Sequence, residues 1–130
     1  MSSKNSLLRR RALVLAVSAA VLSGSALAAG RVETSGLGNN EPVDGFIVTY
    51  RNGSSSKLSV ATQQRSLDQV ASTAFGRAKS LTLKHDRTLG IGSELVQASR
   101  PLDRTEAETL MRQIATNPDV EFVEPNIRLY

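Results

Sequence analysis

Few residues in this 130-residue chain could carry chemistry. There is no cysteine, which excludes a disulfide framework, a thiolate nucleophile, a zinc knuckle and an iron–sulfur site. The single histidine, His85, cannot form a metal site by itself, and its neighbours Lys84, Asp86 and Arg87 predict a position on the surface. The serines lack the G-x-S-x-G pattern of a nucleophile elbow. We therefore expect no enzyme activity, no cofactor and no metal.

The positive charge of the chain is confined to its N-terminus. The formal net charge is +4, but Lys4, Arg9, Arg10 and Arg11 all lie in the first eleven residues. From Ala29 onward, 12 basic residues balance 12 acidic ones. The high isoelectric point therefore gives no support to a nucleic-acid partner, and we expect none.

The N-terminal segment has the pattern of an export signal. After the basic residues comes an uncharged, mostly apolar stretch over 12–22, followed by small residues up to Ala26-Leu27-Ala28. This order predicts cleavage between Ala28 and Ala29. A membrane anchor is the alternative, but eleven helical residues span only about 17 Å of a hydrocarbon core about 30 Å thick. We expect a secreted or periplasmic protein with no stable membrane association after signal removal.

The remainder divides into a linker and one domain. Residues 29–43 contain Gly, Asn and Ser and have no apolar period, which predicts a flexible linker. Residues 44–130 then form a single folded domain with a C-terminal tail.

The first half of this domain reads as strand, helix and strand. Phe46 to Tyr50 is β-branched and aromatic and is followed by the turn pair Asn52-Gly53. Residues 66–78 carry one apolar stripe at helical spacing, with Ser66 and Gln69 in capping-box spacing and a start either there or one turn earlier. Residues 81–85 alternate apolar and polar side chains, as a half-buried strand does.

The second half reads as strand, helix and strand. A turn around Gly90 and Gly92 separates residues 81–85 from a strand over 94–98, and the two predict a hairpin. A helix follows, with Asp103 as N-cap, Glu106 in capping-box spacing and an end at Asn117, which we expect in the left-handed conformation before Pro118. The last strand is predicted over 120–124.

The element order βαββαβ predicts an α+β fold, the ferredoxin-like plait. In this fold two right-handed crossovers build a four-stranded antiparallel sheet with both helices on one face. The plait hosts many activities, so the order by itself indicates no function.

Two segments together resemble a known family. The run from Leu102 to Asn126, above all its end NPDVEFVEPN, is similar to the end of a subtilisin-type propeptide of the inhibitor I9 family, and Phe46 to Tyr50 is similar to that family's first strand. The resemblance covers about residues 45–126. It implies an inhibitor and folding chaperone of a subtilase serine protease, acting in cis or in trans as a monomer.

The resemblance also implies which residues bind. In that family the sheet packs on two surface helices of the protease, and the C-terminal tail lies in the active-site cleft like a substrate. Glu124 would accept hydrogen bonds at a helix N-terminus of the protease, and Asn126 stands where the family usually has an acid, so its contact should be weaker. The tail comprises Ile127, Arg128, Leu129 and Tyr130, with Tyr130 in the primary pocket and Ile127 in another apolar subsite.

Alternatives remain open at this point. The tail residues could be a disordered end, and the junction with a protease could lie beyond Tyr130, so that the chain is either part of a precursor or a free-standing inhibitor. A periplasmic plait serving as an adaptor or sensor without a protease partner is the second functional hypothesis. A metal-carrying plait is disfavoured because that use requires a C-x-x-C pair.

Overall fold

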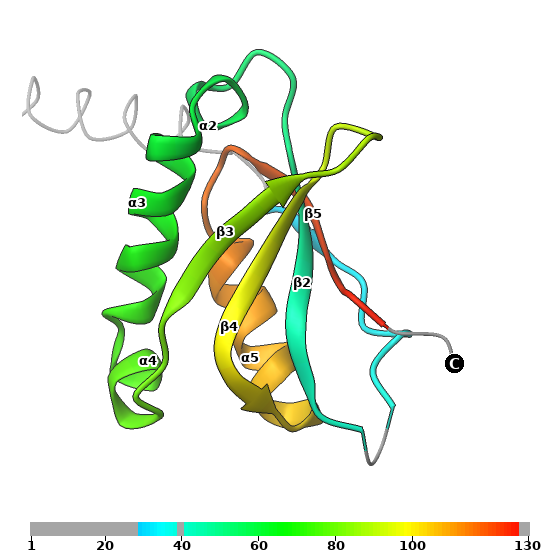
Figure 1. Ribbon diagram of the computed structural model, residues 1–130, viewed down its shortest axis with the longest axis vertical. Coiled ribbons are helices and arrows are strands. Elements are labelled where there is room, and N and C mark those ends of the chain that lie inside the picture. Colours follow the sequence, from blue (N-terminus) through cyan, green and yellow to red (C-terminus); the bar gives the residue numbers. More distant parts are fainter. Residues whose placement is uncertain (1–28, 39–40, 128–130) are drawn as a thin grey trace, which may run out of the picture.

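A five-stranded mixed sheet forms the centre of the protein in the computed structural model, which describes residues 29–38 and 41–127 (Figure 1). The strand order is β1-β5-β2-β4-β3. β1 pairs in parallel with β5, and all other neighbours are antiparallel. The predicted signal segment lies outside the described residues. The strands are β1 Arg31–Val32, β2 Val43–Tyr50, β3 Leu83–Thr88, β4 Glu94–Leu102 and β5 Val120–Pro125.

Two main helices cover one face of this sheet (Figure 1). α3 (Val60–Ala71) contacts β3, and α5 (Arg104–Ile114) contacts β5, β2 and β4. Two short helices, α2 (Ser55–Leu58) and α4 (Ala74–Ala78), flank α3. Apart from β1, the order and connections are those of the ferredoxin-like plait, so the predicted α+β class is confirmed. Among the described helices, none has the length and apolar character that a membrane crossing needs.

The core between sheet and helices is built from the side chains that the sequence pattern placed inward. The apolar stripe of α3 packs on β3 and that of α5 packs on β5, β2 and β4, which is the arrangement that period-2 strands and period-3.6 helices produce. Strands β2 and β5 are held in register here, with Val48 opposite Val123. The largest fully buried apolar side chains are Phe46, Val48, Tyr50, Leu67, Val96, Leu102, Leu110, Met111, Val120 and Val123.

The first helical region differs from its prediction. α3 begins earlier, because the hydroxyl of Ser59 caps it by accepting from the Thr62 amide at 3.2 Å. The predicted cap at Ser66 is wrong. The helix also breaks at Ser72, after which Thr73 caps the separate helix α4. Gly76 allows this tight joint, since a Cβ there would lie 2.2 Å from the Ala71 carbonyl oxygen.

The second helix agrees with its prediction at one end. Asp103 and Glu106 form the expected capping box, with the Glu106 amide donating to Asp103 at 2.8 Å. At the other end the helix closes at Ala115, and among the described non-glycine residues only Ser80 has a positive φ. The left-handed conformation expected for Asn117 is therefore wrong. Its side chain instead accepts from the Asp119 amide at 3.0 Å and turns the chain into β5.

The segment predicted as a flexible linker contains ordered structure. Arg31 and Val32 form β1 against Phe122 and Val123 of β5. Leu37 is buried in the main core at 4% exposure. Its burial and the backbone pairing outweigh the disorder that the Gly- and Ser-containing composition indicated. The structured part of the chain thus begins well before residue 44.

Candidate partner-docking face and tail

The face of the sheet opposite the helices carries the first candidate site. Since Phe46 and Val48 point into the core, alternation places Ile47 and Thr49 on the open face. Register adds their neighbours: Ile47 lies opposite Leu95 on one side and Glu124 on the other, and Thr49 lies opposite Phe122. We call Ile47, Thr49, Leu95, Phe122 and Glu124 the open face.

The open face has an apolar centre with charged surroundings. Leu95 is only 6% exposed, although it lies outside the main core cluster. The Arg31 guanidinium sits over the Phe122 ring, 5.7 Å from its centroid. Arg87 lies opposite Leu95 on β3. Such a surface can bury apolar area against a partner while its rim charges orient the contact.

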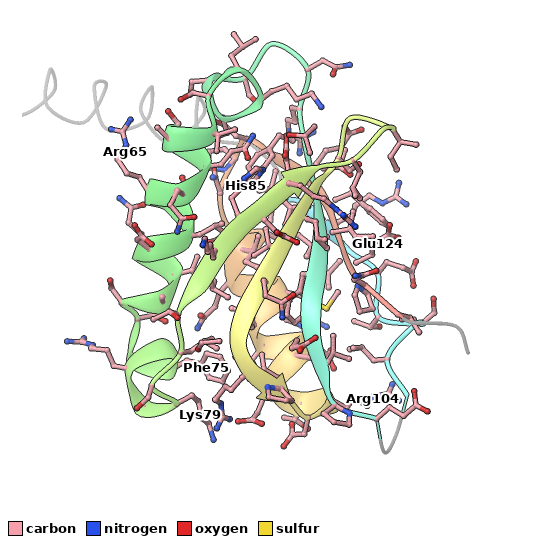
Figure 2. All side chains as sticks on the ribbon, viewed as in Figure 1. Arg65, Phe75, Lys79, His85, Arg104 and Glu124 are labelled. Atoms are coloured by element: carbon pink, nitrogen blue, oxygen red, sulfur yellow. The ribbon has the colours of Figure 1, made fainter. Side chains whose placement is uncertain are left out.

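Glu124 has free bonding capacity on this face. It is half-buried near the end of β5, and within the described part of the chain its carboxylate has no hydrogen bond or ion pair. Figure 2 shows it on β5, separated from His85 on β3 by the central strands. A half-buried carboxylate without partners can accept charge-assisted hydrogen bonds from another molecule. Glu121, three residues earlier on the same strand, is exposed and also unpaired among the residues described.

Another carboxylate, that of Glu94, is satisfied inside the protein. Its side chain is 5% exposed and accepts from His85 Nε2 at 2.6 Å, Thr88 Oγ1 at 2.7 Å and Gln63 Nε2 at 3.3 Å. Burial by itself would raise the pKa of Glu94, but these hydrogen bonds outweigh burial and lower it. We call these four residues the Glu94 cluster.

The Glu94 cluster corrects the surface position predicted for His85, whose side chain is only 12% exposed. Alternation after Leu81 and Leu83 already placed His85 on the inward side, and this was the signal that its charged neighbours obscured. In the described residues no serine hydroxyl bonds to the His85 ring, so the cluster is not a nucleophilic triad. No group of His, Cys, Asp and Glu suited to a metal ion occurs there either.

The start of the C-terminal tail continues the sheet. The Asn126 amide donates to the Gly45 carbonyl at 2.8 Å, which extends the β2–β5 ladder by one residue. The side chain of Ile127 remains 42% exposed. Thus Glu124, Asn126 and Ile127 of the predicted binding residues lie together at the end of β5. Arg128, Leu129 and Tyr130 lie outside the described residues, as does Ala28 of the predicted cleavage site, while Ala29 is the first described residue.

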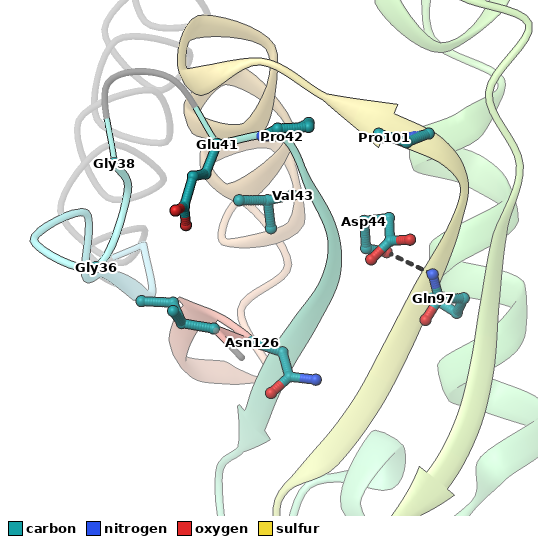
Figure 3. Close-up of a pocket in the computed structure, with 10 residues that line it drawn as sticks. Gly36, Gly38, Glu41, Pro42, Val43, Asp44, Gln97, Pro101 and Asn126 are labelled. Carbon is teal, nitrogen blue, oxygen red and sulfur yellow. Dashed lines mark hydrogen bonds between the residues drawn. The ribbon is translucent and has the colours of Figure 1, made fainter. Parts of the chain in front are cut away.

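A shallow hollow of about 250 Å³ lies where the tail leaves the domain (Figure 3). Part of its lining comes from the segment that sequence composition assigned to a linker. Two other lining residues are joined by the hydrogen bond from Gln97 Nε2 to the Asp44 carbonyl at 3.0 Å. The polar lining makes it a poor site for an apolar ligand. The lining residues are Gly36, Gly38, Glu41, Pro42, Val43, Asp44, Gln97, Pro101, Asn126 and Ile127.

Comparison with known proteins finds two relatives. The chain is 41% identical over 127 residues to an extracellular protease of Xanthomonas campestris, a match that covers 94% of this chain and 22% of that protein. It is 32% identical over 119 residues to an extracellular basic protease of Dichelobacter nodosus, covering 88% of this chain and 19% of that protein.

Neither a protein-family model nor a solved structure matches. The chain thus spans about a fifth of the length of both relatives, and what it resembles is one part of two extracellular proteases.

Proposed function

We propose that this chain is a subtilisin-propeptide-like module of the inhibitor I9 type, which inhibits a subtilase and assists its folding. The observation that carries the proposal is the match of nearly the whole chain to about a fifth of two extracellular proteases. A segment of about a fifth of a precursor's length is what a pro-region would contribute. The plait and the residues from Val120 to Asn126 agree with this assignment.

The open face is suited to docking on helices. Its apolar centre would bury area against a protease surface, and Glu124 would accept hydrogen bonds from the free amides at a helix N-terminus, where the helix dipole favours a carboxylate. One charge-assisted bond of this kind contributes about 1.5–3 kcal/mol. Asn126 can accept such a bond without charge, so its contribution should be smaller.

The tail is suited to strand addition. The Asn126 amide is already bonded to β2, and Ile127 follows it at the end of β5. We propose that Ile127, Arg128, Leu129 and Tyr130 pair with the backbone of the protease cleft, with Tyr130 in the primary pocket and Ile127 in a second subsite. Main-chain bonds would supply affinity and alternate side chains specificity.

Assistance in folding follows from the same contacts. A domain of this size without disulfides buries proportionally little surface, so we expect marginal stability in isolation. A partner that binds only the native form stabilises it by mass action. Conversely, the folded domain would stabilise the native form of the protease that docks on its sheet.

The proposal includes export. The N-terminal pattern predicts cleavage between Ala28 and Ala29, and the two relatives are named extracellular proteases. Intact-mass measurement of the exported chain tests the cleavage site. A species that begins at Ala29 is expected, and one that still carries Arg9 to Arg11 would refute the cleavage.

An inhibition panel tests the function. The exported chain is titrated into subtilisin, a chymotrypsin-type protease and a metalloprotease, and initial rates on chromogenic peptides are recorded. We expect inhibition of subtilisin alone. A chain that stays folded and intact by circular dichroism and gel but leaves subtilisin unaffected would contradict the proposal and favour an adaptor or sensor role.

A further inference from the structure

The segment before β2 crosses the end of β5 and lies against the tail. We call residues 30–38 the N-terminal strap. Its first part adds β1 to the sheet, and its second part, residues 35–36, turns beside the end of β5. The strap is not part of the plait predicted from the sequence, nor of the open face and tail proposed to bind the protease.

The strap is fixed at both ends. The Gly30 amide donates to the Ala115 carbonyl at 2.9 Å, and the Glu33 amide donates to the Val123 carbonyl at 2.9 Å. At the other end, Leu37 is buried in the core and its carbonyl accepts from Arg104 Nη1 at 3.4 Å. The intervening turn therefore has a defined position relative to β5.

Within this turn, Gly36 makes the closest approach to the tail. A Cβ at Gly36 would lie 2.4 Å from Cδ1 of Ile127 and 3.2 Å from Cγ of Pro125. The φ angle of Gly36 is not positive, so a side chain at this position would cause no backbone strain. It would instead clash with the neighbouring side chains. On the other side of the tail, a Cβ at Gly45 would lie 3.3 Å from Cβ of Asn126. The start of the tail is thus held between β2 and the strap.

We infer that the strap sets the direction in which the tail leaves the domain, and that Gly36 is the positioning residue through its contact with Ile127. The consequence for inhibition rests on the proposed function: a tail that leaves in the wrong direction has to be reordered before it can enter the cleft. That reordering lowers affinity without removing any contact with the protease.

The chain supplies a matched pair of glycines for the test. Gly36→Ala puts a methyl group where the Ile127 side chain lies, and the nearest atom it meets is the far end of that flexible side chain. We therefore expect Ile127 to move, the Pro125 ring to shift by only a few tenths of an ångström, and the fold to persist. Gly38→Ala is the control, because the nearest atom to its Cβ would be 3.9 Å away, in ordinary contact. Ile127→Val removes Cδ1 and makes room for the new methyl group.

The first measurement needs no protease. In the exported chain we expect a nuclear Overhauser cross-peak between the Gly36 α-protons and the Ile127 δ1-methyl group. Gly36→Ala should lower the heteronuclear NOE of the Ile127 amide and leave the thermal midpoint within about 2–4 °C, the scatter that surface changes of about 0.5 kcal/mol produce in a domain of this size. Absence of the cross-peak in the unmodified chain would overturn the inference, whether or not the chain inhibits.

The second measurement is the inhibition constant against subtilisin. Gly36→Ala should raise it about tenfold and Gly38→Ala less than twofold, while Gly36→Ala with Ile127→Val should match Ile127→Val alone. The positioning role would be overturned if Gly36→Ala had the same inhibition constant as the unmodified chain. It would also be overturned if the double variant lost as much affinity as the two single variants lose together. A cross-peak together with no inhibition by the unmodified chain would instead refute the proposed function and leave the strap–tail contact standing.

Discussion

Two glutamates of this protein, the buried Glu94 and the half-buried Glu124, differ in their hydrogen bonding. Glu94 is enclosed at the hairpin end of β4, where three side chains of the domain donate to its carboxylate. Glu124 lies on the open face, where within the described residues nothing donates to it. A carboxylate whose bonds are made internally contributes to stability, whereas one left without partners on a half-buried surface is available to another molecule.

Removing the Glu94 carboxylate should have the largest effect, and it should fall on stability. Glu94→Leu leaves His85 Nε2 and Thr88 Oγ1 without their acceptor, while Gln63 Nε2 keeps its bond to the Ser56 carbonyl. We therefore expect a loss of about 3 kcal/mol in the free energy of unfolding. Urea unfolding followed by circular dichroism measures it, with Glu121→Leu as the exposed control. An unchanged midpoint combined with lost inhibition would reverse the roles assigned to the two regions.

Removing the tail should have the next largest effect, and it should fall on binding. A chain that ends after Asn126 lacks the segment proposed for the cleft, so its inhibition constant against subtilisin should rise about a hundredfold, equivalent to about 2.7 kcal/mol. The fold should persist, since Ile127 is 42% exposed. Thermal unfolding of the same sample provides the check. If the shortened chain inhibits as well as the intact one, Tyr130 does not occupy the primary pocket.

The Glu124 side chain should matter for docking and not for the domain itself. Glu124→Gln should weaken inhibition about ten- to a hundredfold, equivalent to about 1.5–3 kcal/mol, with an unchanged thermal midpoint. Glu121→Gln is the matched control on the same strand and should change binding by less than about 0.5 kcal/mol. Both constants are measured at low and moderate salt. Equal losses from both variants would indicate a general charge effect instead of a specific contact.

The smallest expected difference between the two regions is in how the stability of the fold depends on pH. Burial alone would raise the pKa of Glu94, but the hydrogen bonds from His85, Thr88 and Gln63 outweigh it and hold that pKa below its usual value. A carboxyl with a lowered folded-state pKa stabilises the fold above the unfolded pKa of about 4.3, and this contribution is lost as pH falls through the folded pKa. Stability of the unmodified chain should therefore fall between pH 5 and pH 3, and Glu94→Gln should reduce that slope. Urea midpoints at the two pH values measure it, and an equal slope in Glu94→Gln would contradict the prediction.

Asp119 should contribute to the same acid sensitivity. Its Oδ2 accepts from Ser56 Oγ at 2.7 Å and from the Ser56 amide at 3.2 Å, which ties α2 to the turn before β5. The side-chain hydrogen bond from Ser56 is the main cause of a lowered Asp119 pKa. Asp119→Asn should therefore also reduce the fall in stability between pH 5 and pH 3. The size of that reduction can be compared with the reduction in Glu94→Gln.

Local sequence signals predicted the plait because its elements depend on short-range patterns. The capping box at Asp103 and Glu106 and the β-branched and aromatic run from Phe46 to Tyr50 act within a few residues, and the structure has both the cap and the strand. β1 could not be predicted in this way, because its two residues carry no pattern of their own and pair with Phe122 and Val123 about ninety positions later. The strap was missed for the same reason.

The Glu94 cluster depends on register, which the sequence did not specify. A shift in pairing between His85 and Arg87 turns both His85 and Thr88 toward Glu94. The binding residues were predicted from resemblance instead. The structure brings Glu124, Asn126 and Ile127 to one end of β5, and what they bind stays a prediction until a partner is tested.

Photo-crosslinking from two apolar positions tests most directly that the tail, and not the hairpin end of the sheet, meets a protease. A benzophenone side chain replaces Leu129 in the tail or Ile91, which is 82% exposed at the hairpin near Glu94, and each chain is irradiated with catalytically inactive subtilisin. We expect crosslinks from position 129 to residues of the protease cleft and none from position 91. Crosslinks from position 91 as strong as those from position 129, or none from either in a folded chain, would contradict the account.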